Sequence, residues 1–170
     1  GEAFESVPVA VGVADDSFEQ AMGELTRYRR MIRRPNKDDE ELPVIFNDYM
    51  NCLFGDPTTA KELPLIDAAA ACGCEYYVID AGWYAPGEWW DSVGEWKECR
   101  DRFPNGIKEV TDCIRKKGMV PGVWLELEVM GINCEKAKKA PDDWFFVRHG
   151  KRVYDRSRYQ LDFRNPSVIE

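Results

Sequence analysis

Short apolar runs alternate with amphipathic segments from residue 42 onward. The apolar runs occupy 43–46, 76–79 and 120–129, and each ends in polar or aromatic residues. The segments between them, 59–72 and 106–117, carry apolar residues at helical spacing. Nearly continuous apolar strands that alternate with helices are typical of a parallel sheet built from right-handed βαβ units. The pattern therefore predicts an α/β fold for this part of the chain.

Both predicted helices have recognisable ends. Thr59 is followed three residues later by Glu62, which fits a capping box at the start of the first helix. Gly73 and Gly118 follow the two helices and are expected to end them, because glycine adopts the left-handed conformation that often terminates a helix.

The part of the chain before residue 42 has a different pattern. Small apolar residues alternate over 7–13 and predict a strand that has no partner nearby in the sequence. The following segment predicts a helix that begins with a capping box of Asp16 and Glu19 and ends at Pro35. Residues 36–41 are polar and predict a linker. Because a single strand is not a domain, we expect this strand to be the end of a larger domain.

Two architectures fit parallel strands with helical crossovers: a doubly wound sheet and a (β/α)8 barrel. The connection after the first strand, 47–57, lacks the glycine patterns of nucleotide-binding loops, which weakens the doubly wound alternative. The long aromatic loop between 80 and 106 favours the barrel, whose active sites are built from such loops. A complete barrel takes about 250 residues. The sequence thus predicts a partial TIM barrel that contributes its first three strands.

Composition and charge narrow the function classes. The chain has 23 basic and 31 acidic residues, a net charge of −8, and no block of Lys and Arg interleaved with aromatics, so no nucleic-acid partner is expected. No segment approaches the roughly 20 apolar residues of a membrane helix, and no signal peptide is evident. The six cysteines lack the paired spacing of a zinc site, and the sequence has one histidine. We therefore expect free thiols, no metal, no cofactor and a cytoplasmic location.

Asp80 is the first candidate for chemistry, because it ends the apolar run 76–79. It is followed within sixteen residues by five large aromatic residues, Trp83, Tyr84, Trp89, Trp90 and Trp96. Aromatic faces stack on the C–H faces of sugars, and a carboxylate accepts hydrogen bonds from their hydroxyls. The alternatives are a carboxylate satisfied by backbone amides, and aromatics that form a packed lid or a subunit interface.

Two later segments carry further candidates. Trp124, Glu126 and Glu128 alternate, so on a strand they would share one face. The two carboxylates fit either an acid/base pair or, as we favour, a Glu126 that orients its neighbours. Trp124 is expected near the barrel mouth. The segment 155–166 adds four charged residues that are either site groups or surface ion pairs: Arg156, Arg158, Asp162 and Arg164.

Several motifs occur together from residue 42 to the end: PVIFNDY, YYVIDAGWY, GEWKECRDRFPNGIKEVTDCIRKKGMVPGVWLELEVM, DDWF and DRSRYQLDFRNP. In order and spacing they resemble the first part of the catalytic barrel of family-36 glycoside hydrolases, the melibiase-like α-galactosidases. The resemblance implies that 1–14 ends an N-terminal β-sandwich domain, that 15–41 is a linking helix and linker, and that 42–170 begins the barrel.

The resemblance implies a retaining hydrolase of terminal α-galactosides of the raffinose and melibiose type, homo-oligomeric as a full-length protein. The family's catalytic aspartates stand on later strands, so the nucleophile and the acid/base are expected beyond Glu170, and this chain alone is expected to be inactive. The positions that match sugar-binding residues are Asp80, Trp124, Arg156, Trp83 and Tyr49, where the family usually has Trp.

One departure from the family concerns the sugar. The family typically has two consecutive Asp residues before Gly-Trp, and here the second is Ala81. The loss of one acceptor raises the alternatives of an α-N-acetylgalactosaminidase or another α-hexosidase. A non-catalytic sugar-binding protein is the alternative from a different class.

Overall fold

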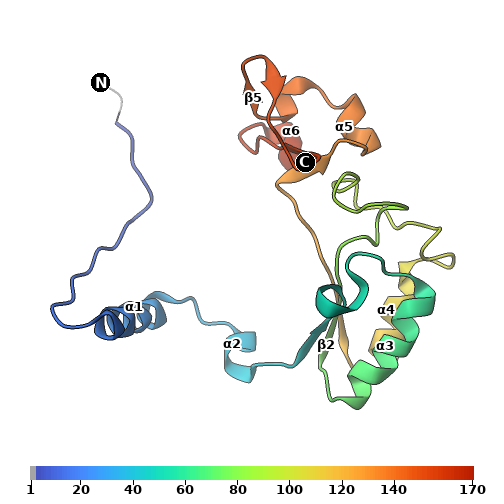
Figure 1. Ribbon diagram of the computed structural model, residues 1–170, viewed down its shortest axis with the longest axis horizontal. Coiled ribbons are helices and arrows are strands. Elements are labelled where there is room, and N and C mark those ends of the chain that lie inside the picture. The colour runs from blue at the N-terminus through green and yellow to red at the C-terminus, as the bar shows by residue number, and fades with distance from the viewer. Residues whose placement is uncertain (1–2) are drawn as a thin grey trace. The chain divides into compact units, whose positions relative to one another are not determined.

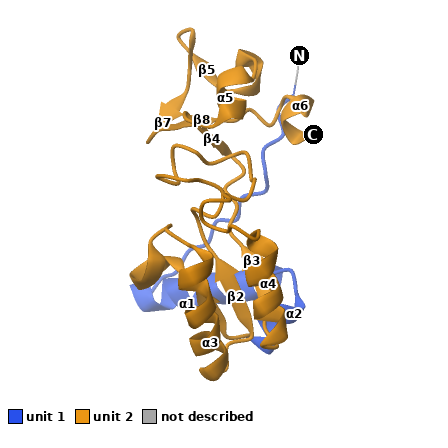
Figure 2. Ribbon diagram, turned by 90° about the vertical axis from the view of Figure 1, so that its right-hand side faces the viewer, with its two compact units in different colours: residues 1–42 blue, residues 43–170 orange. Residues whose placement is uncertain are grey.

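The computed structural model describes residues 3–170, and the chain divides into two compact units after Leu42 (Figure 2). The first unit contains two helices, α1 (Phe18–Ile32) and α2 (Lys37–Glu41). No side chain of α1 or α2 is buried. The predicted polar linker is therefore partly helical, because Asn36 caps α2 by accepting a hydrogen bond from the backbone N–H of Asp39 (3.0 Å).

Two predictions for the first unit are wrong. Residues 7–13 form no strand, and their side chains are all exposed; a strand requires a neighbour for its backbone hydrogen bonds, and none lies beside it in the described residues. The N-cap of α1 is Ser17, which accepts from the backbone N–H of Gln20 (3.2 Å), instead of Asp16.

The second unit begins with a parallel three-stranded sheet in the order β1-β2-β3 (Figure 1). Its elements are β1 (Ile45–Asn47), the irregular helical turn η1 (Tyr49–Leu53), α3 (Thr59–Ala71), β2 (Tyr76–Ile79), α4 (Ile107–Lys116) and β3 (Val120–Val123). Figure 2 shows α3 and α4 side by side against the sheet, and the two helices contact each other. The predicted strand–helix order is confirmed, and both helices end just before their predicted glycines.

The sheet has one well-covered face. Tyr77 and Ile79 of the central strand β2 are fully buried, whereas Tyr76 and Val78, which alternate with them, are only partly buried. The buried pair packs with apolar residues of the helices and the aromatic loop in one core cluster, which includes Ile66, Trp83, Phe103, Val110 and Ile114. This core fixes where β2 ends, and therefore where Asp80 lies.

The third strand is shorter than predicted. Its pairing with β2 ends where Ile79 faces Val123, and the backbone N–H of Trp124 makes a last hydrogen bond to the carbonyl of Ile79 (2.9 Å). Residues 124–128 belong to no strand, since β2 offers no further partner. The prediction that Trp124, Glu126 and Glu128 share the face of one strand is therefore wrong.

The remainder of the chain folds around small antiparallel sheets. Its elements are β4 (Val129–Gly131), α5 (Glu135–Lys139), the 3-10 turn η2 (Asp142–Trp144), β5 (Val147–Arg148), β6 (Lys151–Arg152), β7 (Tyr154–Asp155), β8 (Arg158–Gln160) and α6 (Pro166–Ile169). A sheet of order β4-β8-β7 and the β5-β6 hairpin enclose a second core that includes Met130, Phe145 and Leu161. The helices formed by residues 3–170 include none with the length and apolar character needed to cross a membrane.

Candidate functional site

Asp80 lies directly after β2 and is held by contacts to two neighbouring segments. Its backbone N–H donates to Oδ1 of Asp48 (2.7 Å). Its own Oδ2 accepts from the side-chain amide of Asn47 (2.7 Å), and its Oδ1 accepts from the backbone N–H of Ala81 (2.7 Å). Each carboxylate oxygen has a second lone-pair direction, so the half-buried group can still accept hydrogen bonds from a ligand.

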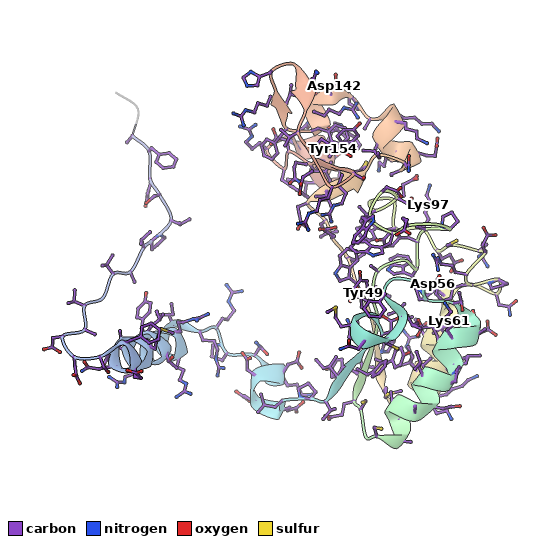
Figure 3. The ribbon with its side chains drawn as sticks, viewed as in Figure 1. Tyr49, Asp56, Lys61, Lys97, Asp142 and Tyr154 are labelled. Carbon is purple, nitrogen blue, oxygen red and sulfur yellow. The ribbon has the colours of Figure 1, made fainter. Side chains whose placement is uncertain are left out.

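Aromatic side chains gather beside this carboxylate in one connected cluster. Trp89 contacts both Trp124 and Tyr49, with ring centroids 5.2 and 6.0 Å apart, and its indole N–H donates to the Tyr49 hydroxyl (3.2 Å). Figure 3 shows Tyr49 in the turn that follows β1. The indole N–H of Trp83 donates to the carbonyl of Trp124 (3.1 Å). Three of the five predicted residues, Tyr49, Trp83 and Trp124, are therefore brought together.

The members of this cluster differ in exposure. Trp83 is buried, with 7% of its surface exposed, whereas Tyr49 and Trp124 are half-buried. A buried ring supports its neighbours, and only a partly open ring offers a face to a ligand. The geometry thus gives Trp83 the role of fixing the backbone of Trp124.

Arg156 has no hydrogen bond or ion pair with these residues. It occupies the tip of the β7–β8 hairpin, is exposed, and has a left-handed φ of 45°, as does the next residue, Ser157 (φ 63°). Two consecutive positive φ values are typical of a two-residue type I′ turn. In the described part of the chain, the Arg156 side chain makes no hydrogen bond or ion pair.

Arg158, two residues further on, is half-buried and has a charged partner. Its Nη1 donates to both oxygens of Glu126 (2.8 and 2.6 Å), and the two side chains are 14% and 19% exposed. An orienting role for Glu126, which the sequence favoured, requires such a contact, and the role itself stays a prediction. The sequence named Arg158 and Glu126 as separate candidates but did not predict their pairing, because the two residues lie in different segments of the chain.

The buried Tyr84 hydroxyl interacts electrostatically with Glu126, Asp80 and Arg158. Burial raises the pKa of Tyr84, and the charges of Glu126 and Asp80 raise it further, while Arg158 opposes them. Among residues 3–170, the Tyr84 hydroxyl and Nε of Arg158 are buried without a hydrogen-bond partner. Two donors are therefore free near Asp80 and the Glu126–Arg158 pair.

Two surface cavities of about 330 Å³ lie elsewhere and contain none of the predicted site residues. One is lined by α5 and Trp144, and the other by the start of α3 and the loop before α4. Within residues 3–170, no group of three or more His, Cys, Asp or Glu side chains is arranged to hold a metal ion. All six cysteines are free thiols.

Comparison with known proteins supplies the family. Residues 4–170 match the family model described as Melibiase. The chain is 30% identical over its whole length to alpha-galactosidase AgaA of Geobacillus stearothermophilus, of which it covers 24%. It is 28% identical over 98% of its length to alpha-galactosidase Mel36A of Lactobacillus acidophilus, of which it covers 23%. The chain thus spans about a quarter of the length of these curated relatives.

Solved structures agree with the sequence comparison. The family-36 alpha-galactosidase AgaB of Geobacillus stearothermophilus matches with a TM-score of 0.71 and 28% identity, over 83% of this chain and 20% of that one. A variant of AgaA in complex with raffinose matches with a TM-score of 0.67 and 27% identity, over 74% of this chain and 18% of that one. Because the family model spans nearly the whole chain, this protein belongs to the melibiase family of glycoside hydrolases.

Proposed function

We propose that the full-length protein hydrolyses terminal α-galactosides of the raffinose and melibiose type, with retention of configuration. The observation that carries the proposal is the Asp80 carboxylate. It follows a parallel strand, is held by Asn47 and Ala81, and has lone pairs free beside the aromatic cluster. A carboxylate beside partly open aromatic rings matches a neutral, hydroxyl-rich ligand. The relatives named alpha-galactosidases, one of them in complex with raffinose, support the same substrate class.

Within this proposal, 42–170 provides the first three strands of a (β/α)8 barrel, 1–14 ends a β-sandwich domain, and 15–41 links the two. The parallel order β1-β2-β3 with α3 and α4 as crossovers supports the barrel. The nucleophile and the acid/base are assigned to later strands beyond Glu170. A cytoplasmic location fits the free cysteines, since disulfides are rare there. A homo-oligomer is part of the same proposal, and light scattering of the full-length protein measures it.

The site residues then take distinct roles. Asp80 accepts hydrogen bonds from galactose hydroxyls, and the half-buried rings of Trp124 and Tyr49 form the wall of the sugar pocket. Trp83 holds Trp124 in place through its backbone carbonyl. We assign the arginine contact to Arg158, whose Nε is buried and free, ahead of the exposed Arg156.

Replacing Asp80 by Asn in the full-length protein tests the assignment. The amide keeps the shape but removes the charge, and a hydrogen bond to a charged group contributes about 1.5–3 kcal/mol. We therefore expect kcat/KM on a nitrophenyl α-galactoside to fall about 10- to 100-fold. Asp67→Asn is the matched control, because Asp67 is an exposed carboxylate that pairs with Lys117. Equal kinetics of the two variants would remove Asp80 from the site.

A second candidate differs in the sugar. Ala81 is buried, with 1% of its surface exposed, and stands where the family usually has a second Asp. A site with one hydrogen-bond acceptor fewer for galactose hydroxyls favours a substrate with another sugar, such as an α-N-acetylgalactosaminide. A panel of nitrophenyl α-glycosides separates the two by kcat/KM. Binding of galactose without turnover of any glycoside would instead indicate a non-catalytic sugar-binding protein.

A further inference from the structure

Two carboxyl groups are buried directly behind Asp80. Asp48 follows β1 and is 2% exposed, while Glu62 lies in the first turn of α3 and is fully buried. Tyr77 of β2 is fully buried beside them. The end of β1, the start of α3 and the strand β2 thus each place one polar side chain inside an otherwise apolar core. Buried carboxylates are costly unless they are paired or protonated, so this arrangement requires an explanation.

Hydrogen bonds account for half of the carboxyl oxygens. The Tyr77 hydroxyl donates to Oε2 of Glu62 (2.6 Å), and the backbone N–H of Asp80 donates to Oδ1 of Asp48 (2.7 Å). The other two oxygens, Oε1 of Glu62 and Oδ2 of Asp48, are buried and have no N–H or O–H partner in the described part of the chain. The two side chains interact: a hydrogen bond between them raises the pKa of Glu62 and lowers that of Asp48, in each case after the larger effect of burial, which raises both.

Two ionised carboxylates cannot hydrogen-bond each other, because both only accept. A single proton between them satisfies both remaining oxygens and removes one buried charge. We propose that Glu62 is a neutral acid that donates its proton to Asp48, and that it thereby acts as a positioning residue for Asp80. The assignment of Asp80 rests on the proposed function; the shared proton does not.

The surrounding groups support Glu62 as the proton carrier. Burial, followed by the hydrogen bond and the charge of Asp48, raises the pKa of Glu62 to about 9. Burial and the charge of Asp80 also raise the pKa of Asp48, but the hydrogen bonds from Glu62 and from the Asp80 N–H favour its charged form. The hydrogen bond from Tyr77 and the charge of Lys61 lower the pKa of Glu62. Burial, and then the negative charges of Asp48 and Glu62, raise the pKa of the Cys52 thiol. No full positive charge is buried with the pair among residues 3–170.

The proton matters for Asp80 because the contacts form one chain. Glu62 holds Asp48, and Asp48 holds the peptide N–H of Asp80. If Glu62 loses its proton, two like charges face each other and Asp48 is pushed away from α3. The Asp80 peptide then loses its acceptor, and the carboxylate loses the orientation in which it meets a sugar.

Glu62→Gln and Glu62→Met in the full-length protein test the positioning role. Gln keeps a donor toward Asp48 and an acceptor for Tyr77, whereas Met keeps only the size. We expect wild-type KM for an α-galactoside to rise at alkaline pH with little change in kcat, and Glu62→Gln to abolish that rise. Glu62→Met raises KM at least about 10-fold at neutral pH. An alkaline KM rise that persists in Glu62→Gln overturns the proposal.

Thermal unfolding tests the shared proton without any substrate. Between about pH 5 and about pH 9 the folded protein binds one proton at Glu62 that the unfolded chain releases, so this group makes stability fall as pH rises. Glu62→Gln does not titrate, and its Tm relative to wild type therefore increases across this range. A Tm difference that is constant with pH overturns the shared proton.

Crystal structures of the two variants separate the two proposals. Asp80 is expected unmoved in Glu62→Gln and displaced in Glu62→Met; an unmoved Asp80 in both overturns the positioning role. If the wild-type protein cleaves no α-galactoside but the Tm shift and the Asp80 displacement appear, the proposed function fails and the inference about Glu62 stands. If Glu62→Met does not fold, Glu62→Gln alone decides through KM and Tm.

Discussion

At the scale of single residues, Gly82 shows how closely the chain packs beside the site. It stands two positions after Asp80 and has a φ of 99°, in the left-handed region. A Cβ built at this position would collide with the backbone carbonyl of Gly55. Both the positive φ of residue 82 and the lack of space for a Cβ therefore require glycine. With glycine at this position, the loop after β2 can pack directly against the backbone that follows η1.

Gly82→Ala is expected to destabilise the protein far more than Gly73→Ala. Gly73 has a similar φ of 81°, but a Cβ there would meet nothing within 4 Å. The shared backbone strain costs roughly 1–2 kcal/mol, and only Gly82 adds a backbone collision. Denaturant unfolding of both variants measures the difference. Similar losses of free energy of unfolding would show that the Gly55 backbone moves aside at little cost.

The sequence predicted candidate side chains but not how they pair, for a physical reason. Asp80 follows directly from the apolar run that ends before it, and Trp124 from the alternation within its segment, which is local information. Arg158, in contrast, meets Glu126 thirty-two positions away, and Glu62 meets Tyr77 fifteen positions away. Such pairs depend on how elements dock, and no periodicity in the sequence encodes that docking.

At the scale of elements, the N-cap residues of α1 and α3 were each predicted one position away from their place in the structure. For α3 the pattern Thr59 to Glu62 predicts a capping box, but Thr58 is the N-cap and accepts from the backbone N–H of Lys61 (3.3 Å). The reason is Glu62: its carboxyl is buried against Tyr77 and cannot reach back to the helix start. A tertiary contact thus overrides a local capping rule.

Thr58→Ala and Thr59→Ala are expected to differ accordingly. Loss of the Thr58 cap costs about 1 kcal/mol, seen as a lower midpoint in denaturant. The Thr59 hydroxyl is buried without a partner among the described residues, so its removal is expected to be neutral or slightly stabilising. A larger loss for Thr59→Ala would mean that Thr59 is the cap.

The short strand β3 shows that an alternating sequence pattern does not by itself establish a strand. Trp124 and Glu126 are half-buried while Leu125 and Leu127 are exposed, so burial still alternates after the strand ends. The alternation was visible in the sequence, but strand pairing was not, because it depends on the length of the neighbour β2. Alternation therefore holds for the half-buried Trp124 and Glu126 but fails at Glu128, which is exposed, and the predicted strand is absent there.

At the scale of the whole molecule, the predicted order of parallel strands is confirmed, but the sheet has two unpaired edges in the described part of the chain. β1 and β3 each pair only with β2. Their apolar side chains are open to solvent: Ile45 is 58% exposed, Val120 49% and Val123 43%. Exposed apolar edges are templates for pairing with another chain.

The isolated 170-residue chain is therefore expected to self-associate through these edges. Light scattering over a dilution series measures the association, and Ile45→Lys is expected to reduce it, because a charged side chain at an edge opposes strand pairing. Arg33→Lys, a conservative change at an exposed position outside the sheet, serves as the control. A monomer at all concentrations would mean that the edges are protected.

The aromatic cluster has a consequence for how ligand binding can be observed. Trp83, Trp89, Trp96 and Trp124 are linked by ring contacts with centroids no more than 6.1 Å apart, and Trp124 is a half-buried member. Indoles at such separations share excitation energy, so a sugar that quenches or shields one of them alters the fluorescence of all. The protein thereby contains an intrinsic optical reporter, and occupancy can be followed by emission without any attached dye.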